Sequence, residues 1–262
     1  MAVRKALRTV GSVAILGTLK LLYPPHCPLC QADLASSEEE TRKLRFVCEG
    51  CLAQIQRVEL PYCAHCGDPL EKSGLDLCGR CGHEEIPFER ACSFGIYEGV
   101  LARLIQLLKF HGERALAREL APLLAQVIKQ EDLAERIKGI TFVPMSRNSF
   151  SKRGFNQSEL LAQHLGKILN KPVFSTLLKT RETRPQVDLS GEERLENLKD
   201  VFSPSSSAHC DSVLLIDDVY TTGSTVKECS RALCTADYEH VYVLTLARTR
   251  LPSSSDANAH ES

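Results

Sequence analysis

The segment that most constrains this 262-residue chain is VLLIDDVYTTGST, residues 213–225. Its four apolar residues predict a buried strand, with Asp217 and Asp218 at the carboxyl end, where α/β sheets place their ligands. Carboxylates there accept directional hydrogen bonds from vicinal hydroxyls. Gly223 tolerates positive φ, and the hydroxyl-rich turn around it predicts a helix start whose N–H groups converge on an anion. The segment predicts an α/β domain with adjoining hydroxyl and phosphate sites.

The same thirteen residues resemble the phosphoribosyl pyrophosphate (PRPP) motif of type I phosphoribosyltransferases. The resemblance implies that Asp217 and Asp218, the catalytic candidates, hold the ribose hydroxyls. It assigns the 5-phosphate to a turn made of Tyr220, Thr221, Thr222, Gly223, Ser224 and Thr225. Tyr220 replaces a usual aliphatic residue and is expected to alter packing under the turn without touching it. Thr221 replaces the acid that serves the purine ring in hypoxanthine-guanine phosphoribosyltransferases, which disfavours that chemistry.

A second phosphate-binding segment is predicted within residues 139–169. A strand is expected to end at Pro144, and a helix to begin near Asn156, with a cationic loop between them. Guanidinium groups pair phosphate oxygens bidentately, so we assign Arg147 and Arg153, beside Gly154, to pyrophosphate, with Mg²⁺ neutralising its charge. Taken alone, this charge run is also typical of a solvated loop.

A long polar stretch at residues 181–198 is the third candidate, because such loops in compact domains are often lids. The candidate lid residues are Arg181, Arg184 and Arg194. An exposed linker with a short helix over residues 190–199 is an equal alternative.

Four Cys-x-x-Cys pairs occupy the N-terminal third, separated by gaps of 17, 11 and 11 residues. Two such pairs close a tetrahedral zinc site with no open position, so eight cysteines predict two structural zinc ions. Sequential pairing is the simpler arrangement, and interleaved pairing, disulfides or a redox dithiol stay open. The predicted ligands are Cys27, Cys30, Cys48, Cys51, Cys63, Cys66, Cys78 and Cys81.

The remaining apolar patterns predict the core. Residues 100–110 and 114–130 have helical spacing, and Pro122 is expected to kink the second helix or to start a new one. Lys109 is interpreted as an ordinary cation at a helix C-terminus. Residues 239–248 predict a final buried strand.

The first 25 residues contain an apolar run interrupted by Lys20, which is too short to span a membrane. An amphipathic helix that docks on the protein is favoured over membrane association, and a cytoplasmic location is expected. The net charge of −1 gives no support for a globally basic, nucleic-acid-binding surface.

The order of the motifs resembles the ComF family over about residues 12–250: YPPHCPLC, YCAHCGDPL, LIQLLKFHG, VPMSRNSFSKRGFNQS, TRPQVDLSGEER and LIDDVYTTGST. The resemblance implies a type I phosphoribosyltransferase-like parallel sheet flanked by helices and preceded by a zinc-ribbon module. The predicted domains are an amphipathic helix (1–25), a double zinc ribbon (26–85), a phosphoribosyltransferase-like domain (86–250) and a disordered tail (251–262). The resemblance also implies a role in DNA uptake during natural competence, with PRPP and single-stranded DNA or competence proteins as partners.

Two functions follow from this organisation. In the first, the protein is an enzyme that transfers a phosphoribosyl group to an unidentified acceptor, mainly by positioning and electrostatics. In the second, it is a non-catalytic PRPP sensor whose zinc ribbons bind nucleic acid or a protein partner. A general base would favour the enzyme, and the sequence displays no obvious one.

Overall fold

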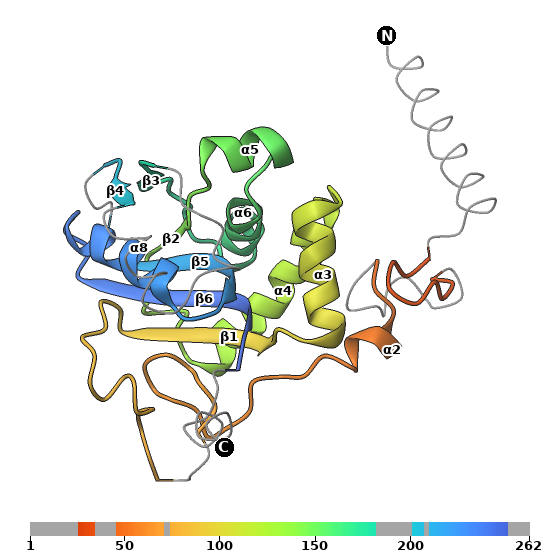
Figure 1. Cartoon of the computed structure of the whole chain (residues 1–262), viewed down its shortest axis with the longest axis horizontal. Coiled ribbons are helices and arrows are strands. Elements are labelled where there is room, and N and C mark those ends of the chain that lie inside the picture. The colour runs from red at the N-terminus through yellow and green to blue at the C-terminus, as the bar shows by residue number, and fades with distance from the viewer. Residues whose placement is uncertain (1–25, 35–45, 71–73, 182–200, 207–209, 251–262) are drawn as a thin grey trace, which may run out of the picture. The chain divides into compact units, whose positions relative to one another are not determined.

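The computed structural model describes residues 26–34, 46–70, 74–181, 201–206 and 210–250 (Figure 1). The predicted N-terminal helix and C-terminal tail lie outside these residues. The chain divides into two compact units, Met1–Gln54 and Ile55–Ser262. This boundary falls inside the predicted zinc-ribbon module of residues 26–85, so its two halves are described separately.

In the first unit, the described chain surrounds one cysteine cluster and contains the short helix α2 (Glu49–Leu52). Cys48 is the N-cap of α2, and its sulfur accepts a hydrogen bond from the Cys51 N–H at 3.3 Å. The helix start therefore holds two cysteines at close range.

The second unit is built on a four-stranded parallel sheet in the order β1-β6-β5-β2. Its strands are β1 (Arg90–Ile96), β2 (Gly139–Phe142), β5 (Ser212–Tyr220) and β6 (His240–Arg248). The two central strands are buried almost throughout, as expected for a parallel sheet covered on both faces. A separate antiparallel pair joins β3 (Leu177–Lys179) to β4 (Phe202–Pro204).

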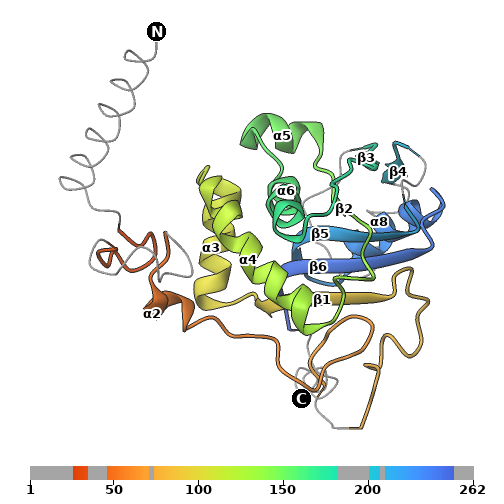
Figure 2. The same ribbon diagram turned by 180° about the vertical axis from the view of Figure 1, so that it is seen from behind.

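Helices cover both faces of this sheet (Figures 1 and 2). One face carries α3 (Gly99–Phe110), α4 (Ala115–Gln130) and α6 (Gln157–Leu169), and the other carries α8 (Ser224–Cys234). The predicted parallel sheet flanked by helices is confirmed. The chain continues through Pro122 as the single helix α4, so the expectation that this proline starts a new helix is wrong.

The predicted cationic loop is largely a helix, α5 (Arg147–Arg153). Ser146 caps its start by accepting a hydrogen bond from the Ser149 N–H at 3.2 Å, and Gly154 ends it at φ 74°. These two caps bound a short helix of 7 residues between β2 and α6. The preceding strand β2 ends at Phe142, two residues before the expected position.

The core on the α8 face continues into the second cysteine group. Val213 and Leu215 of β5 and Val226 and Leu233 of α8 share one buried cluster with Cys63, Cys66 and Cys81. The second half of the zinc-ribbon module is therefore part of the sheet domain's core. Within the described residues, no helix combines the length and apolarity that a membrane span requires.

Candidate functional site

Asp217 and Asp218 lie near the carboxyl end of β5 and are 9% and 4% exposed. The Ser158 hydroxyl donates to Asp217 Oδ1 at 3.1 Å, and the Gln157 amide donates to Asp218 Oδ2 at 2.5 Å. Both donors come from the first turn of α6. The packing of α6 against β5 therefore orients both carboxylates.

Lys109 is a site residue that sequence reasoning missed. Its Nζ lies 2.8 Å from Asp218 Oδ1. Burial lowers the pKa of Lys109, but attraction to Asp218 and Asp217 outweighs burial and leaves this pKa above its usual value. Its sequence signal, a lysine at the end of an apolar helix, is ordinary, so only the approach of α3 to β5 reveals its role.

The environment of the Asp217 carboxyl disfavours its charged form. Burial and the adjacent Asp218 charge raise its pKa to about 7, although Lys109, the Asp218 N–H and Ser158 act in the opposite direction. Loss of water and like-charge repulsion both disfavour the charged form. A ligand that offers hydroxyl donors would therefore compensate for lost hydration here.

The turn at residues 220–225 leads directly into α8, with Gly223 at φ 80° as the N-cap. The Thr222 and Ser224 hydroxyl oxygens lie 2.8 Å apart. This turn and the two acids line the same cavity, which has a volume of about 160 Å³. It is lined by Lys109, Asp217, Asp218, Val219, Tyr220, Thr221, Gly223, Thr225 and Val226. The structure thus brings the predicted acids and most of the predicted turn to one cavity.

Tyr220 packs directly beneath this turn. Its side chain is 2% exposed, and a Cβ placed on Gly223 would overlap its hydroxyl. The expectation that Tyr220 leaves the turn untouched therefore differs from the structure. Gly223 is required here for two reasons, its positive φ and the space that Tyr220 occupies.

The two predicted pyrophosphate cations lie at opposite ends of α5. Arg153 is half-buried, lies over the Phe110 ring at 5.2 Å, and donates to Gln157, which in turn donates to Asp218. Arg147 is exposed. Neither is among the described residues that line the 160 Å³ cavity. Arg153 is thus connected to the acids through one amide, whereas Arg147 is not brought to them.

The remaining predicted residues of these segments are placed as follows. The Gly154 carbonyl accepts a hydrogen bond from Arg114 Nη2 at 2.9 Å. Arg181 is exposed at the end of the described segment. Arg184 and Arg194 lie outside the described residues.

The eight predicted zinc ligands form two clusters of four, and in each the sulfur atoms lie within 4.8 Å of one another. The first cluster is Cys27, Cys30, Cys48 and Cys51, and the second is Cys63, Cys66, Cys78 and Cys81. This arrangement is the sequential pairing, and none of these cysteines forms a disulfide.

Both clusters fit tetrahedral zinc. The Cys27–Cys51, Cys30–Cys48 and Cys66–Cys78 sulfur distances are 3.8, 3.5 and 3.7 Å. Tetrahedral Zn–S bonds of about 2.3 Å place sulfurs about 3.8 Å apart.

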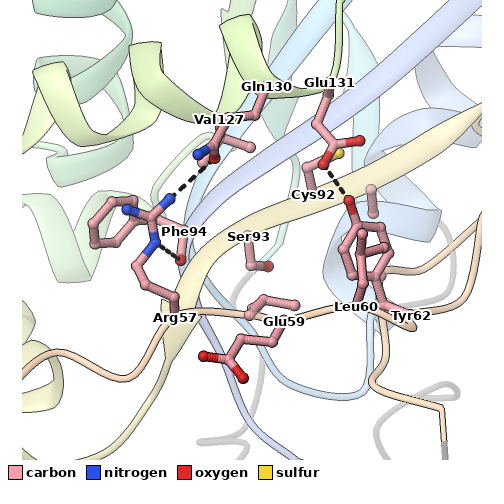
Figure 3. Close-up of a pocket in the computed structure, with 13 residues that line it drawn as sticks. Arg57, Glu59, Leu60, Tyr62, Cys92, Ser93, Phe94, Val127, Gln130 and Glu131 are labelled. Carbon is pink, nitrogen blue, oxygen red and sulfur yellow. Dashed lines mark hydrogen bonds between the residues drawn. The ribbon is translucent and has the colours of Figure 1, made fainter.

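A second cavity, of about 340 Å³, lies over β1 where residues 57–62 pass along the strand (Figure 3). Arg57 Nε donates to the Phe94 carbonyl at 3.1 Å, and its guanidinium stacks on the Phe94 ring. Glu131 accepts from the Tyr62 hydroxyl and pairs with Arg90 at 2.6 Å. Arg57 and Glu131 each already have partners within the protein. This cavity is therefore a weaker candidate for binding a charged ligand than the cavity beside Asp217 and Asp218.

The comparisons with known proteins agree with this organisation. A family model described as a double zinc ribbon domain matches residues 18–82. Competence protein F of Haemophilus influenzae is 35% identical over 209 residues, covering 77% of this chain and 90% of that protein. DNA utilization protein YhgH of Salmonella typhimurium is 35% identical over 237 residues, covering 87% and 99%. Competence protein ComFC of Streptococcus pneumoniae is 28% identical over 202 residues, covering 71% and 87%.

Among solved structures, a hypoxanthine phosphoribosyltransferase from Staphylococcus aureus matches 55% of this chain and 70% of its own, with a TM-score of 0.33 and 16% identity. The sequence matches are far more extensive, because they span nearly the whole length of relatives more than 30% identical. On the evidence of these relatives, the chain belongs to the ComF family and carries a double zinc ribbon.

Proposed function

We propose that this protein binds PRPP with Mg²⁺ at the end of β5 and acts as a phosphoribosyltransferase-like component of DNA uptake. The observation that carries the proposal is the shared cavity, into which two carboxylates and the anion-binding turn of α8 both open. A sugar phosphate requires these two kinds of group within a few ångströms of each other.

Each part of the ligand has a partner in this proposal. Asp217 and Asp218 accept hydrogen bonds from the ribose hydroxyls, and the turn at residues 220–225 receives the 5-phosphate. Arg153 and Arg147 meet the pyrophosphate, whose charge Mg²⁺ reduces. Lys109 holds the Asp218 carboxylate in position while the ribose binds.

In the transferase form of the proposal, a nucleophilic acceptor forms a bond to the anomeric carbon. The bond to the pyrophosphate oxygen breaks, and pyrophosphate leaves with the electron pair. In the sensor form, PRPP binds in the same way and no bond breaks. Pyrophosphate release, measured with PRPP, Mg²⁺ and a panel of nitrogen and oxygen nucleophiles, separates these two forms.

Calorimetric titration tests the shared binding step. The Asp217→Asn, Asp218→Asn double variant exchanges two charge-assisted hydrogen bonds for neutral ones and is expected to bind PRPP about a hundredfold more weakly. Asp211→Asn, an exposed acid next to the opposite end of β5, is the matched control and should bind as the wild type does. Unchanged affinity in the double variant would remove the site assignment.

The link to DNA uptake draws on the names of the relatives, Competence protein F and DNA utilization protein YhgH. We propose a cytoplasmic protein whose first zinc cluster contributes to weak binding of single-stranded DNA. Such binding should weaken steeply as salt rises. A fluorescence anisotropy titration of the full chain and of its Cys27→Ser, Cys30→Ser variant tests this, and equal binding by both would move the DNA contact away from that cluster.

A further inference from the structure

The second zinc cluster sends one side chain into the anion-binding turn. Arg80 lies between two zinc ligands, Cys78 and Cys81, and its Nη1 donates to the Thr222 carbonyl at 3.1 Å. The two residues are 142 positions apart in the chain. A backbone atom of the turn is therefore held by a residue of the zinc knuckle.

The rest of the Arg80 guanidinium is buried. Nε and Nη2 have no hydrogen-bond partner within the described part of the chain. A zinc ion bound by four thiolates carries net negative charge, so the filled cluster would stabilise this buried cation.

A second contact joins the same two regions. Glu84, which follows the knuckle, forms an ion pair with Lys227 in the first turn of α8. The Lys227 side chain is only 6% exposed, and the backbone N–H of Lys227 donates to the Gly223 carbonyl at 2.9 Å. The zinc knuckle thus holds the turn and the beginning of the helix that follows it.

The ribbon also supports the underside of the turn. Arg248 donates to the Cys66 carbonyl and lies over the Tyr220 ring at 5.2 Å, and Tyr220 in turn fills the space beneath Gly223. Arg80 of the ribbon and Arg248 of β6 therefore connect the ribbon to the turn by two separate routes. Of these two residues, only Arg80 bonds to the backbone of the turn among the contacts described.

We propose that Arg80 is a positioning residue that couples the shape of the anion-binding turn to the zinc ion of the second cluster. This inference rests on the proposed function, because it assigns a 5-phosphate to that turn. Coupling between two binding sites is reciprocal. Loss of Arg80 should weaken binding of the 5-phosphate. In turn, a bound phosphate should slow the release of the zinc ion of the second cluster.

The first experiment measures ligand affinity by calorimetry in the full, zinc-loaded chain. Arg80→Gln should bind ribose 5-phosphate and PRPP about tenfold or more weakly, and equally so, because both ligands carry the 5-phosphate. Arg80→Lys, which keeps the charge, should lose less. The matched control is Arg57→Gln, since Arg57 also donates to a backbone carbonyl at 3.1 Å but lies over β1. Wild-type affinity in Arg80→Gln would overturn the proposal.

The second experiment follows zinc transfer from the wild-type chain to a colorimetric chelator. Ribose 5-phosphate should slow the release of one of the two zinc ions several-fold. The Cys27→Ser, Cys30→Ser double variant, which lacks two ligands of the first cluster, should still release its remaining zinc ion slowly when the ligand is bound. In Arg80→Gln the protection should disappear while elemental analysis still finds about two zinc ions. A ligand that binds the wild type but slows neither zinc ion would refute the coupling alone, whereas failure of the wild type to bind either ligand would refute the proposed function.

Discussion

Lys109 Nζ lies 2.8 Å from Asp218 Oδ1, so the end of α3 is joined to the end of β5 inside the candidate ribose site. The Asp218 side chain is 5% exposed and that of Lys109 is 20% exposed. A pair this well shielded from water interacts more strongly than a surface ion pair. Removing one partner also leaves the other charge poorly solvated.

This ion pair predicts that Asp218→Asn lowers the free energy of unfolding by about 2 kcal/mol. That is less than the cost of orphaning a fully buried charge, because Lys109 keeps some contact with water. Adding Lys109→Met to Asp218→Asn should restore most of the lost stability and none of the lost PRPP affinity. Urea denaturation of the wild type, the two single variants and the double variant completes a double-mutant cycle. A double variant no more stable than Asp218→Asn would contradict this account.

The raised pKa of Asp217 predicts that stability falls as pH rises from about 4 to about 7. In this window the folded protein holds a proton on Asp217 that the unfolded chain has released, since an unfolded aspartate titrates near pH ~3.9. Asp217→Asn should reduce the decline. Urea denaturation at about pH 5 and about pH 7.5 checks this, with Asp211→Asn expected to retain the wild-type dependence. The interpretation fails if Asp217→Asn follows the wild-type profile.

The connection of Arg153 to the acids predicts a ligand-specific effect. Arg153→Ala should weaken PRPP binding about tenfold and ribose 5-phosphate binding much less, because only PRPP carries the pyrophosphate. Arg147→Ala should have the smaller effect of the two, since Arg147 is exposed at the far end of α5. Calorimetric titrations of both ligands give the comparison, and equal losses for the two ligands would place Arg153 elsewhere.

The cysteine clusters predict about two zinc ions per chain by elemental analysis. Cys63→Ser should lower the melting temperature of the sheet domain strongly, because Cys63 belongs to the buried core on the α8 face. Cys27→Ser should spare that transition, because the first cluster belongs to the other compact unit. Circular dichroism melts of the two variants separate these effects, and a chain purified without zinc would exclude the structural role.

Residues 213–225 illustrate how much of the site the sequence by itself determined. The strand, the positive φ at Gly223 and the start of α8 depend on interactions among neighbours a few residues apart, so a single segment was enough to predict them. Cys-x-x-Cys spacing is equally local and indicated two zinc clusters. Between Pro144 and Asn156 the sequence predicts a cationic loop, whereas in the structure Ser146 and Gly154 cap the short helix α5.

Only the tertiary structure decided which side chains meet these local motifs. Lys109 from α3, Gln157 from α6 and Arg80 from the zinc knuckle approach β5 and its turn from distant parts of the chain. A lysine at a helix end and an arginine between two cysteines look ordinary in the sequence. Their roles follow from the packing of helices and ribbon against the two faces of one sheet, which brings together residues that no local spacing relates.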